Sequence, residues 1–203
     1  MTLTILGVSG ELGQELTRQA LDGGHDVVAI SRHPERVDGG HRLTRVAADV
    51  LDPDAIAKAL AGAENVLCAL GVSKGESAGV LTAGANAIIA AAPSRIVSVG
   101  AFGTGASATA AGLLTRTLLG VFLRTELADK IAADTAILSA GGTVFHAGPM
   151  TDGPVSTTRR SVPPDRVPRR LFPAGVSRAT VAAAMIEAVH RETRGEILVP
   201  LAR

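Results

Sequence analysis

Short apolar runs alternate along the chain with longer segments in which apolar residues recur at helical spacing. The runs occupy residues 3–8, 26–30, 43–48, 65–70, 95–99, 143–146 and 196–201. Such short, almost wholly apolar runs are typical of strands buried on both faces of a parallel sheet. The intervening segments predict five helices, at residues 12–22, 53–61, 80–92, 124–140 and 179–191.

Residues at the helix starts support this division of the chain. Asp52 is suited to cap the second helix, with Pro53 at its first position, and Ser177 is suited to cap the last one. Strands and helices then alternate throughout. The pattern predicts an α/β fold, a Rossmann-like doubly wound parallel sheet of six or seven strands, in a single domain over residues 1–203. Right-handed crossovers and the Rossmann strand order are the expected topology.

One segment does not follow the alternation. Residues 151–173 are rich in proline and arginine, which predicts an extended loop, with a short edge strand at 155–160. The segment could form one wall of a substrate cleft that favours anionic groups, or it could be a solvated excursion. Together with loops at about 72–79 and 102–120, it is expected to lie on the substrate side of the domain.

The composition narrows the classes of function. Aromatic residues make up 2% of the chain, with four Phe and neither Trp nor Tyr, and the formal net charge is +1. Nothing in this balance steers the protein towards nucleic acid, and aromatic platforms for stacking bases are lacking. We therefore expect a small-molecule substrate and no nucleic-acid partner.

Cys68 is the single cysteine and lies in an apolar run, so a disulfide framework is excluded and a buried, inert thiol is expected. No apolar run has the length of a membrane span, and residues 1–8 look like a core strand rather than a signal segment. A cytoplasmic protein without a membrane partner or a metal site is expected. An oligomer is possible, but the sequence does not determine one.

A glycine-rich turn follows the first apolar run and leads directly into the first helix. Strand, glycine turn and helix form the arrangement that binds a pyrophosphate at a helix N-terminus. Gly7 would allow the tight turn, Gly10 the close approach of backbone to phosphate, and Gly13 the close packing of helix on strand. The whole turn is a predicted dinucleotide site, formed by Gly7, Val8, Ser9, Gly10, Glu11, Leu12 and Gly13.

The end of the second run indicates which dinucleotide is preferred. An NAD site favours an acid about 20 residues past the glycines, whereas an NADP site favours a cation for the 2′-phosphate. No acid occurs here before Glu35, and the predicted cofactor-binding residues are Ser31, Arg32, His33 and Arg36. NADP(H) is therefore preferred over NAD(H), although a solvated basic turn would look the same.

The carboxyl ends of the other strands complete the predicted cofactor site, because α/β sheets bind ligands at that edge. Asp49 could contact the adenine amino group, or it could be an ordinary residue at a strand end. The further predicted cofactor-binding residues are Asp49, Val50, Ala69, Leu70, Gly71, Val99, Gly100, Lys130, Gly148, Pro149 and Met150.

Four local stretches resemble one family, and together they span nearly the whole chain. Residues 7–13 are similar to its G-A-T-G-x-x-G turn, and residues 48–53 resemble its G-D-V-x-D-P. Residues 148–154 are similar to R-P-G-x-L-T-D-G-P without the first residues, and residues 176–182 resemble I-S-R-x-D-V-A. The chain resembles the atypical short-chain dehydrogenases/reductases, in the group of NmrA-like proteins and biliverdin or flavin reductases.

The chain departs from the wider superfamily at the catalytic positions. Catalytic members use Ser, Tyr and a Lys four residues after the Tyr, but this chain has no Tyr. Lys130 stands where family helices present a side chain to the nicotinamide ribose, or it is only an i,i+4 partner of Glu126. His146 could donate a proton near neutral pH, or it could be a satisfied histidine at a strand end.

The resemblance implies two functions that the sequence leaves open. The first is an NADPH-dependent reductase of a small conjugated acceptor, such as a flavin or a quinone, working without a Tyr-Lys proton relay. The second is a non-catalytic NADP-binding redox sensor of the NmrA-like kind. An epimerase or dehydratase is a third option, and the missing Tyr base counts against it.

Overall fold

The computed structural model describes residues 1–72, 79–109, 124–168, 174–191 and 194–202. Its main sheet has eight strands in the order β3-β2-β1-β4-β5-β6-β10-β8. Seven of them are parallel, and β8 (Arg160–Val162) runs antiparallel along β10 at one edge. The seven parallel strands are β1 (Thr2–Leu6), β2 (Asp26–Ser31), β3 (Leu43–Ala47), β4 (Asn65–Cys68), β5 (Arg95–Ala101), β6 (Thr143–Ala147) and β10 (Ile197–Leu201).

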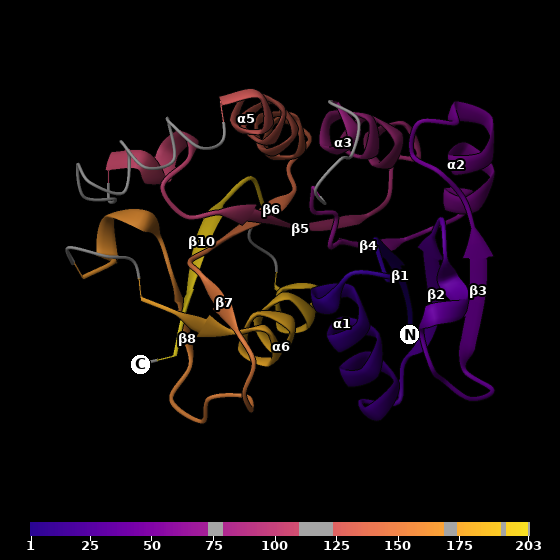
Figure 1. The fold of residues 1–203 in the computed structure, drawn as a ribbon, viewed down its shortest axis with the longest axis horizontal. Helices are drawn as coiled ribbons and strands as arrows, with labels where there is room; N and C mark the ends of the chain where they lie inside the picture. Colours follow the sequence, from indigo (N-terminus) through magenta and orange to yellow (C-terminus); the bar gives the residue numbers. More distant parts are fainter. Residues whose placement is uncertain (73–78, 110–123, 169–173, 192–193, 203) are drawn as a thin grey trace.

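Helices cover both faces of this sheet (Figure 1). One layer holds α1 (Glu11–Asp22) and α6 (Arg178–Ala188), which pack on each other. The other holds α2 (Pro53–Leu60), α3 (Val80–Ala90) and α5 (Arg124–Ser139). Short pieces complete the chain: the 3₁₀ turns η1 (Pro34–Arg36), η2 (Gly105–Thr109) and η3 (Pro164–Arg166), and a two-stranded sheet of β7 (Met150–Thr151) and β9 (Val176–Ser177).

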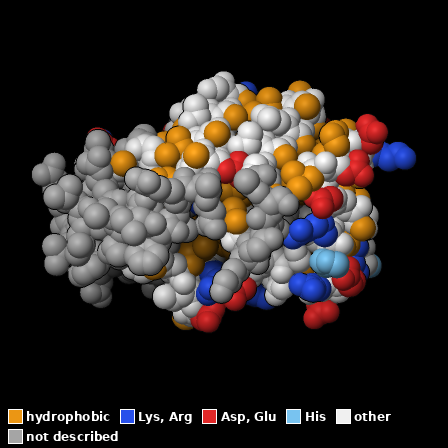
Figure 2. Space-filling view, turned by 45° about the horizontal axis from the view of Figure 1, so that its top comes forward, with side chains coloured by type: hydrophobic (Ala, Val, Ile, Leu, Met, Phe, Trp, Pro, Cys, Tyr) orange, Lys and Arg blue, Asp and Glu red, His pale blue; other side chains and the backbone are white. Residues whose placement is uncertain are grey.

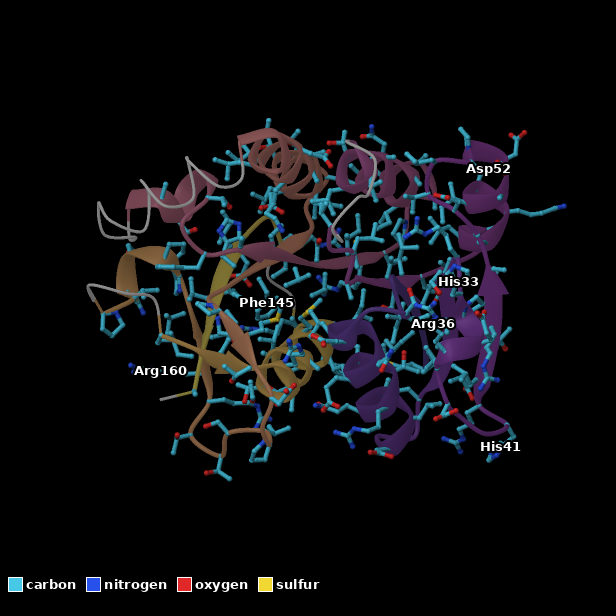
Figure 3. All side chains as sticks on the ribbon, in the orientation of Figure 1. His33, Arg36, His41, Asp52, Phe145 and Arg160 are labelled. Atoms are coloured by element: carbon cyan, nitrogen blue, oxygen red, sulfur yellow. The ribbon has the colours of Figure 1, made fainter. Side chains whose placement is uncertain are left out.

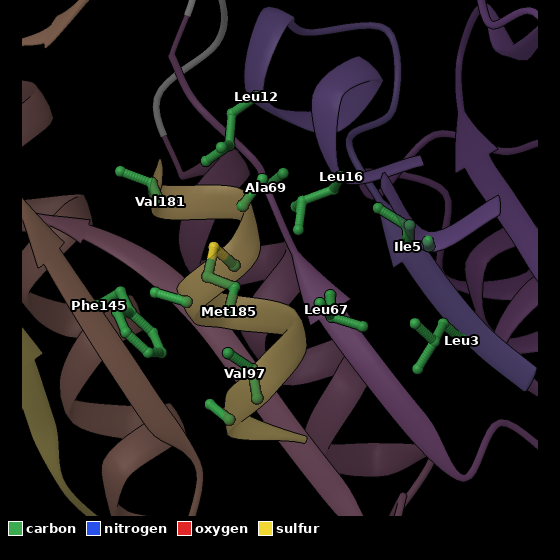
Figure 4. Close-up of a cluster of buried hydrophobic side chains, with 14 of the residues drawn as sticks. Leu3, Ile5, Leu12, Leu16, Leu67, Ala69, Val97, Phe145, Val181 and Met185 are labelled. Carbon is green, nitrogen blue, oxygen red and sulfur yellow. The ribbon is translucent and has the colours of Figure 1, made fainter. Parts of the chain in front are cut away.

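Alternate residues of each strand enter two separate hydrophobic cores, as a doubly wound sheet requires. Leu67, Val97 and Phe145 face α1 and α6, where Met185 fills the centre of the cluster (Figure 4). Their strand neighbours face α3 and α5 instead, as Val144 does. The alternation fixes the direction of every strand-end side chain, because successive residues point to opposite faces.

The predicted fold class is confirmed, including the Rossmann strand order 3-2-1-4-5-6. All seven predicted strands and all five predicted helices are present. Asp52 and Ser177 cap α2 and α6 by accepting hydrogen bonds from the N–H groups of Ala55 and Thr180.

The edge strand differs from the prediction, because it lies at Arg160–Val162 rather than at 155–160. Residues before it bond elsewhere. The Ser156 N–H donates to the Thr180 hydroxyl, and the Ser156 hydroxyl donates to Ala202 O. The sequence pattern alone could not show this, because the competing partners come from α6 and the end of β10.

Candidate functional site

The glycine turn between β1 and α1 is closed by backbone contacts that leave no room for a Cβ at Gly7 or Gly13. Gly7 has φ +88°, and a Cβ there would lie 2.9 Å from the Ala69 carbonyl carbon. A Cβ on Gly13 would lie 2.3 Å from Gly7 O. Gly10 begins α1 without a side-chain cap, so the first-turn N–H groups are available to an anion. The residues present therefore fit a pyrophosphate group.

A cavity of about 380 Å³ opens above this turn, along the carboxyl edge of the sheet. Most of the predicted cofactor-binding residues line it: Gly7, Ser9, Gly10, Glu11, Leu12, Ser31, Arg32, Asp49, Val50, Ala69, Leu70, Gly71, Val99, Gly100, Lys130, Gly148 and Met150. The turn from β1 to α1 lies between two groups of lining residues, each with one cationic side chain. We call them the Arg32 end (Ser31, Arg32, Asp49) and the Lys130 end (Lys130 with Gly100 and Ala101).

Some predicted residues do not line the cavity, namely Val8, Gly13, His33, Arg36 and Pro149. Val8 is buried, and Gly13 acts through helix packing. His33 and Arg36 are exposed next to β2 (Figure 3), and the Nδ1 atom of His33 lies 3.3 Å from Glu35 Oε1.

At the Arg32 end, short-range hydrogen bonds shape the turns that follow β2 and β3. The Ser31 hydroxyl accepts a hydrogen bond from the His33 N–H, at 3.2 Å. The Asp49 carboxylate accepts one from the Leu51 N–H, at 3.0 Å. Both side chains line the cavity beside Arg32, so this end offers a guanidinium and a hydroxyl to an anionic group.

At the Lys130 end, α5 is fixed against the start of α3 by the residue next to Lys130. Asp129 accepts hydrogen bonds from the N–H groups of Leu81 and Thr82 and from the Thr82 hydroxyl. The N-cap of α3 is Gly79, which has no side chain, so a carboxylate from another helix does the capping. Burial by itself would raise the pKa of Asp129, but these hydrogen bonds outweigh it and lower the pKa.

Lys130 lines two spaces at once, the large cavity and a small internal one behind it. The small cavity also touches Cys68, Ser98 and Asp134. Cys68 is buried, and that burial raises the pKa of its thiol, which agrees with the inert role expected for it.

His146 does not reach the cavity, because its place on β6 turns it towards α5 and buries it to 1% exposure. Its Nδ1 atom lies 2.7 Å from the Ser107 hydroxyl. Its Nε2 atom lies 3.2 Å from Asp134 Oδ2, but the alignment is too poor for a hydrogen bond, and neither atom has another partner among the described residues.

Ser107, His146 and Asp134 are the residue types of a hydrolase catalytic triad, but a substrate cannot reach the serine. Ser107 is fully buried, and its Oγ already accepts a hydrogen bond from the Gly103 N–H. No substrate carbonyl can approach it there, so nucleophilic catalysis by Ser107 is ruled out on access alone.

Gly100 lies at the end of β5, where nearby side chains leave no room for a Cβ. A Cβ at this position would lie 2.7 Å from Asp134 Oδ2 and 2.9 Å from His146 Cδ2. The carboxylate and the imidazole thus occupy the space beside the strand end that a longer residue would need.

The sequence prediction missed several cavity residues: Leu6, Ala48, Val72, Val80, Ala101, Ala147 and Arg178. Arg178 pairs with Glu11 at 2.5 Å and with Asp152 at 2.7 Å. It joins the glycine turn to the segment after β7. The signals for it in the sequence were its place directly after the Ser177 cap and its match to the Arg of the I-S-R-x-D-V-A stretch.

Most of the proline- and arginine-rich segment lies away from the cavity. Among its described residues, and counting Met150 at its entry, only Met150 lines the cavity. Arg159 pairs with Glu187 of α6, and Arg160 lies on the far side of the molecule from His33 and Arg36 (Figure 3). Residues 73–78 and 110–120 of the other predicted loops lie outside the described residues.

A second hollow, of about 430 Å³, lies between α2 and α3. Hydrophobic side chains gather on the face where these helices lie (Figure 2), and among the described residues that line the hollow only Asn86 is polar. Within the described ranges, no helix is long and apolar enough to cross a membrane, and no cluster of three His, Cys, Asp or Glu residues could hold a metal ion.

Solved structures similar to this chain share its fold at low sequence identity. An anaerobillin reductase, ChuY from Escherichia coli, is 16% identical, with a TM-score of 0.79 over 100% of this chain and 97% of that one. A short-chain dehydrogenase/reductase from Veillonella parvula in complex with NADP is 17% identical, with a TM-score of 0.79 over 98% and 93%.

A putative epimerase from Bacteroides thetaiotaomicron is 23% identical, with a TM-score of 0.79 over 98% of this chain and 95% of that one. No curated protein sequence shows significant similarity to the chain. The family model described as NAD(P)H-binding matches residues 7–192, from the first glycine of the turn to beyond α6. The chain therefore belongs to the NAD(P)H-binding family, which confirms the resemblance found in its sequence.

Proposed function

We propose that this protein is an NADPH-dependent reductase of a small conjugated acceptor, such as a flavin, a quinone or a related molecule. The observation that carries the proposal is a dinucleotide cavity with a cation at one end, Arg32, and a cation at the other, Lys130. When bound, the dinucleotide supplies the hydride.

The choice of NADPH over NADH rests on the Arg32 end. A guanidinium can form paired hydrogen bonds with the 2′-phosphate, and the Ser31 hydroxyl stands beside it. Asp49 is the only acid in this part of the cavity lining, and its carboxylate already accepts a hydrogen bond from the Leu51 N–H. His33 and Arg36, both exposed, would contribute a weaker positive field at the same end.

The choice of a conjugated acceptor rests on the lack of a general acid, such as a Tyr or an accessible His, at the Lys130 end. The chain has no Tyr, and His146 is enclosed by Ser107 and Asp134. A ketone would need a general acid for its developing alkoxide. A conjugated acceptor spreads the added charge and takes its proton from water, so Lys130 needs only to bind and orient the reacting groups through its N–H donors.

One of the similar solved structures is an anaerobillin reductase, which agrees with a reductase function for this chain. The missing Tyr also favours a second function, a non-catalytic NADP-binding sensor. Binding and turnover separate the two.

The deciding experiment measures NADPH oxidation by the purified chain with riboflavin, FMN, a quinone and a redox dye, alongside calorimetric binding of NADPH. The expected result is tight binding together with turnover of at least one acceptor. Binding without any turnover would overturn the reductase and support the sensor. Failure to bind either NADPH or NADH would overturn both.

A further inference from the structure

Three buried polar side chains meet behind the Lys130 end, and they come from three different elements. Ser107 belongs to η2, Asp134 to α5 and His146 to β6. Their exposed fractions are 0%, 7% and 1%, so water does not screen them. A carboxylate buried to this degree requires a partner, and His146 Nε2 lies 3.2 Å from Asp134 Oδ2.

The proton positions follow from this geometry. The 3.2 Å contact with Asp134 favours a ring with a hydrogen on Nε2, because a bare ring nitrogen would set its lone pair against the carboxylate. Nδ1 then has two states. In the neutral ring it is bare and accepts the Ser107 O–H; in the imidazolium it carries a second hydrogen and donates to Ser107 Oγ.

The protonation state of Nδ1 determines which hydrogen bonds the Ser107 hydroxyl can make within its own turn. Its Oγ accepts a hydrogen bond from the Gly103 N–H at 2.9 Å and lies 3.0 Å from Thr104 O. The single hydroxyl hydrogen can serve either Nδ1 or Thr104 O, but not both. Only when Nδ1 is protonated is the hydroxyl free to donate to Thr104 O, which gives the turn one more hydrogen bond.

We propose that His146 is a proton-linked positioning residue, which braces the turn from Gly103 to Ser107 more tightly when its ring is charged. The negative charge of Asp134 stabilises the imidazolium of His146 in this buried position. The turn begins just after Ala101, which lines the Lys130 end, so the brace controls the chain that leaves the cavity there.

The charged and titratable groups around the ring set the balance between its two states. On α5, Asp134 favours the imidazolium, while Lys130, one helical turn earlier, opposes it. Cys68 on β4 stays neutral because burial raises the pKa of its thiol. The adjacent parts of β5 and η2 present Ser98, Gly100 and hydroxyl groups, none of which titrates in this range.

Amide hydrogen exchange of the turn, measured by mass spectrometry without any ligand, tests the brace. After correction for the intrinsic pH effect, we expect about tenfold more protection at pH 5 than at pH 8, the range in which histidines change charge and the size of one added hydrogen bond. Ser107→Ala and His146→Gln should both lose this pH dependence. Ser156→Ala, which removes hydroxyl bonds on the far side of α6, should keep it.

Wild-type protein showing no pH dependence, or the Ser107→Ala variant keeping all of it, would overturn the proposal. If His146→Gln does not fold, ring ¹⁵N spectra of the wild type provide the second measurement. Nδ1 of His146 should gain a hydrogen on acidification, and a ring that keeps one hydrogen throughout would contradict the brace.

One consequence rests on the proposed function. In the wild type, the KM for the acceptor should decrease as the pH is lowered. In Ser107→Ala the KM should no longer depend on pH in this way, while the Kd for NADPH is unchanged. If no acceptor is reduced, the reductase proposal fails, and the exchange result still decides the brace.

Discussion

At the Arg32 end of the cavity, polar side chains are held by residues close to them in sequence, whereas at the Lys130 end the holding residues are far along the chain. Ser31 and Asp49 each accept a hydrogen bond from an N–H two residues later. Ser107 and His146 are 39 residues apart, and Asp129 caps a helix that begins 49 residues earlier.

This difference shows how one fold can keep a cofactor site while its reaction site changes. The Arg32 end depends on short turns that follow strands, and such turns are specified locally. The Lys130 end depends on three packed elements, so a change at one position needs a matching change at another. Gly100 beside Asp134 and His146 is a matched set of this kind.

The largest effect is expected from a substitution in the glycine turn between the two ends. In Gly13→Ala the new Cβ would meet Gly7 O at 2.3 Å, and the turn must shift. We expect NADPH to bind about 100-fold more weakly, as measured by calorimetry. This loss corresponds to the upper part of the range of about 1–3 kcal/mol that overpacking costs. Gly40→Ala is the control, because a Cβ there meets nothing within 4 Å and the residue does not line the cavity; equal losses would contradict the packing argument.

The Arg32 end alone is tested by Arg32→Ala. Removing a charge-assisted contact to the 2′-phosphate should weaken NADPH binding about 30-fold, with a much smaller loss for NADH. Arg36→Ala, on the same exposed turn but outside the cavity lining, should change the NADPH:NADH affinity ratio only slightly. An equal loss for both dinucleotides in Arg32→Ala would show that Arg32 does not contact the phosphate.

The matched set at the Lys130 end is tested by Gly100→Ala, followed by urea unfolding. The added methyl group would meet the Asp134 carboxylate at 2.7 Å and should lower the free energy of unfolding by about 1–3 kcal/mol. Adding Asp134→Ala should restore part of that loss, because it removes the clashing group. A stability equal to that of Gly40→Ala, where a Cβ meets nothing within 4 Å, would contradict the assignment.

The smallest expected effect concerns the cap that Asp129 provides for α3. Asp129→Asn should lower the free energy of unfolding by about 1 kcal/mol near neutral pH. Since folding lowers the pKa of Asp129, its carboxylate stabilises the fold above its ordinary pKa of about 4, and this is lost as the pH falls through the lowered value.

The difference in the free energy of unfolding between wild type and Asp129→Asn should therefore be smaller in acid than near neutral pH, as measured by urea unfolding under both conditions. Thr82→Val, which removes only the hydroxyl donor, should lose less stability than Asp129→Asn. A difference that is constant with pH would show that the charge of Asp129 is not what caps the helix.

The sequence determined the strand order, the cofactor turn and most of the cavity lining, because these depend on local patterns. Apolar runs specify buried strands, and the glycines at residues 7, 10 and 13 specify a turn that a Cβ at Gly7 or Gly13 would block. Once the strands are parallel and doubly wound, their carboxyl ends meet at one edge, which is why Asp49, Gly71 and Gly148 were found without any contact information.

Only the tertiary structure decided what surrounds Lys130 and what His146 does. The sequence left His146 as a proton donor or a satisfied strand-end residue, and its direction depends on which face of β6 packs against α5. Asp134 and Ser107 gave no signal of their own, since a carboxylate inside a helix and a serine in a glycine-rich loop are ordinary features. Their meaning arises from burial, which removes water as a partner and brings His146 within 2.7 Å of the Ser107 hydroxyl and 3.2 Å of the Asp134 carboxylate.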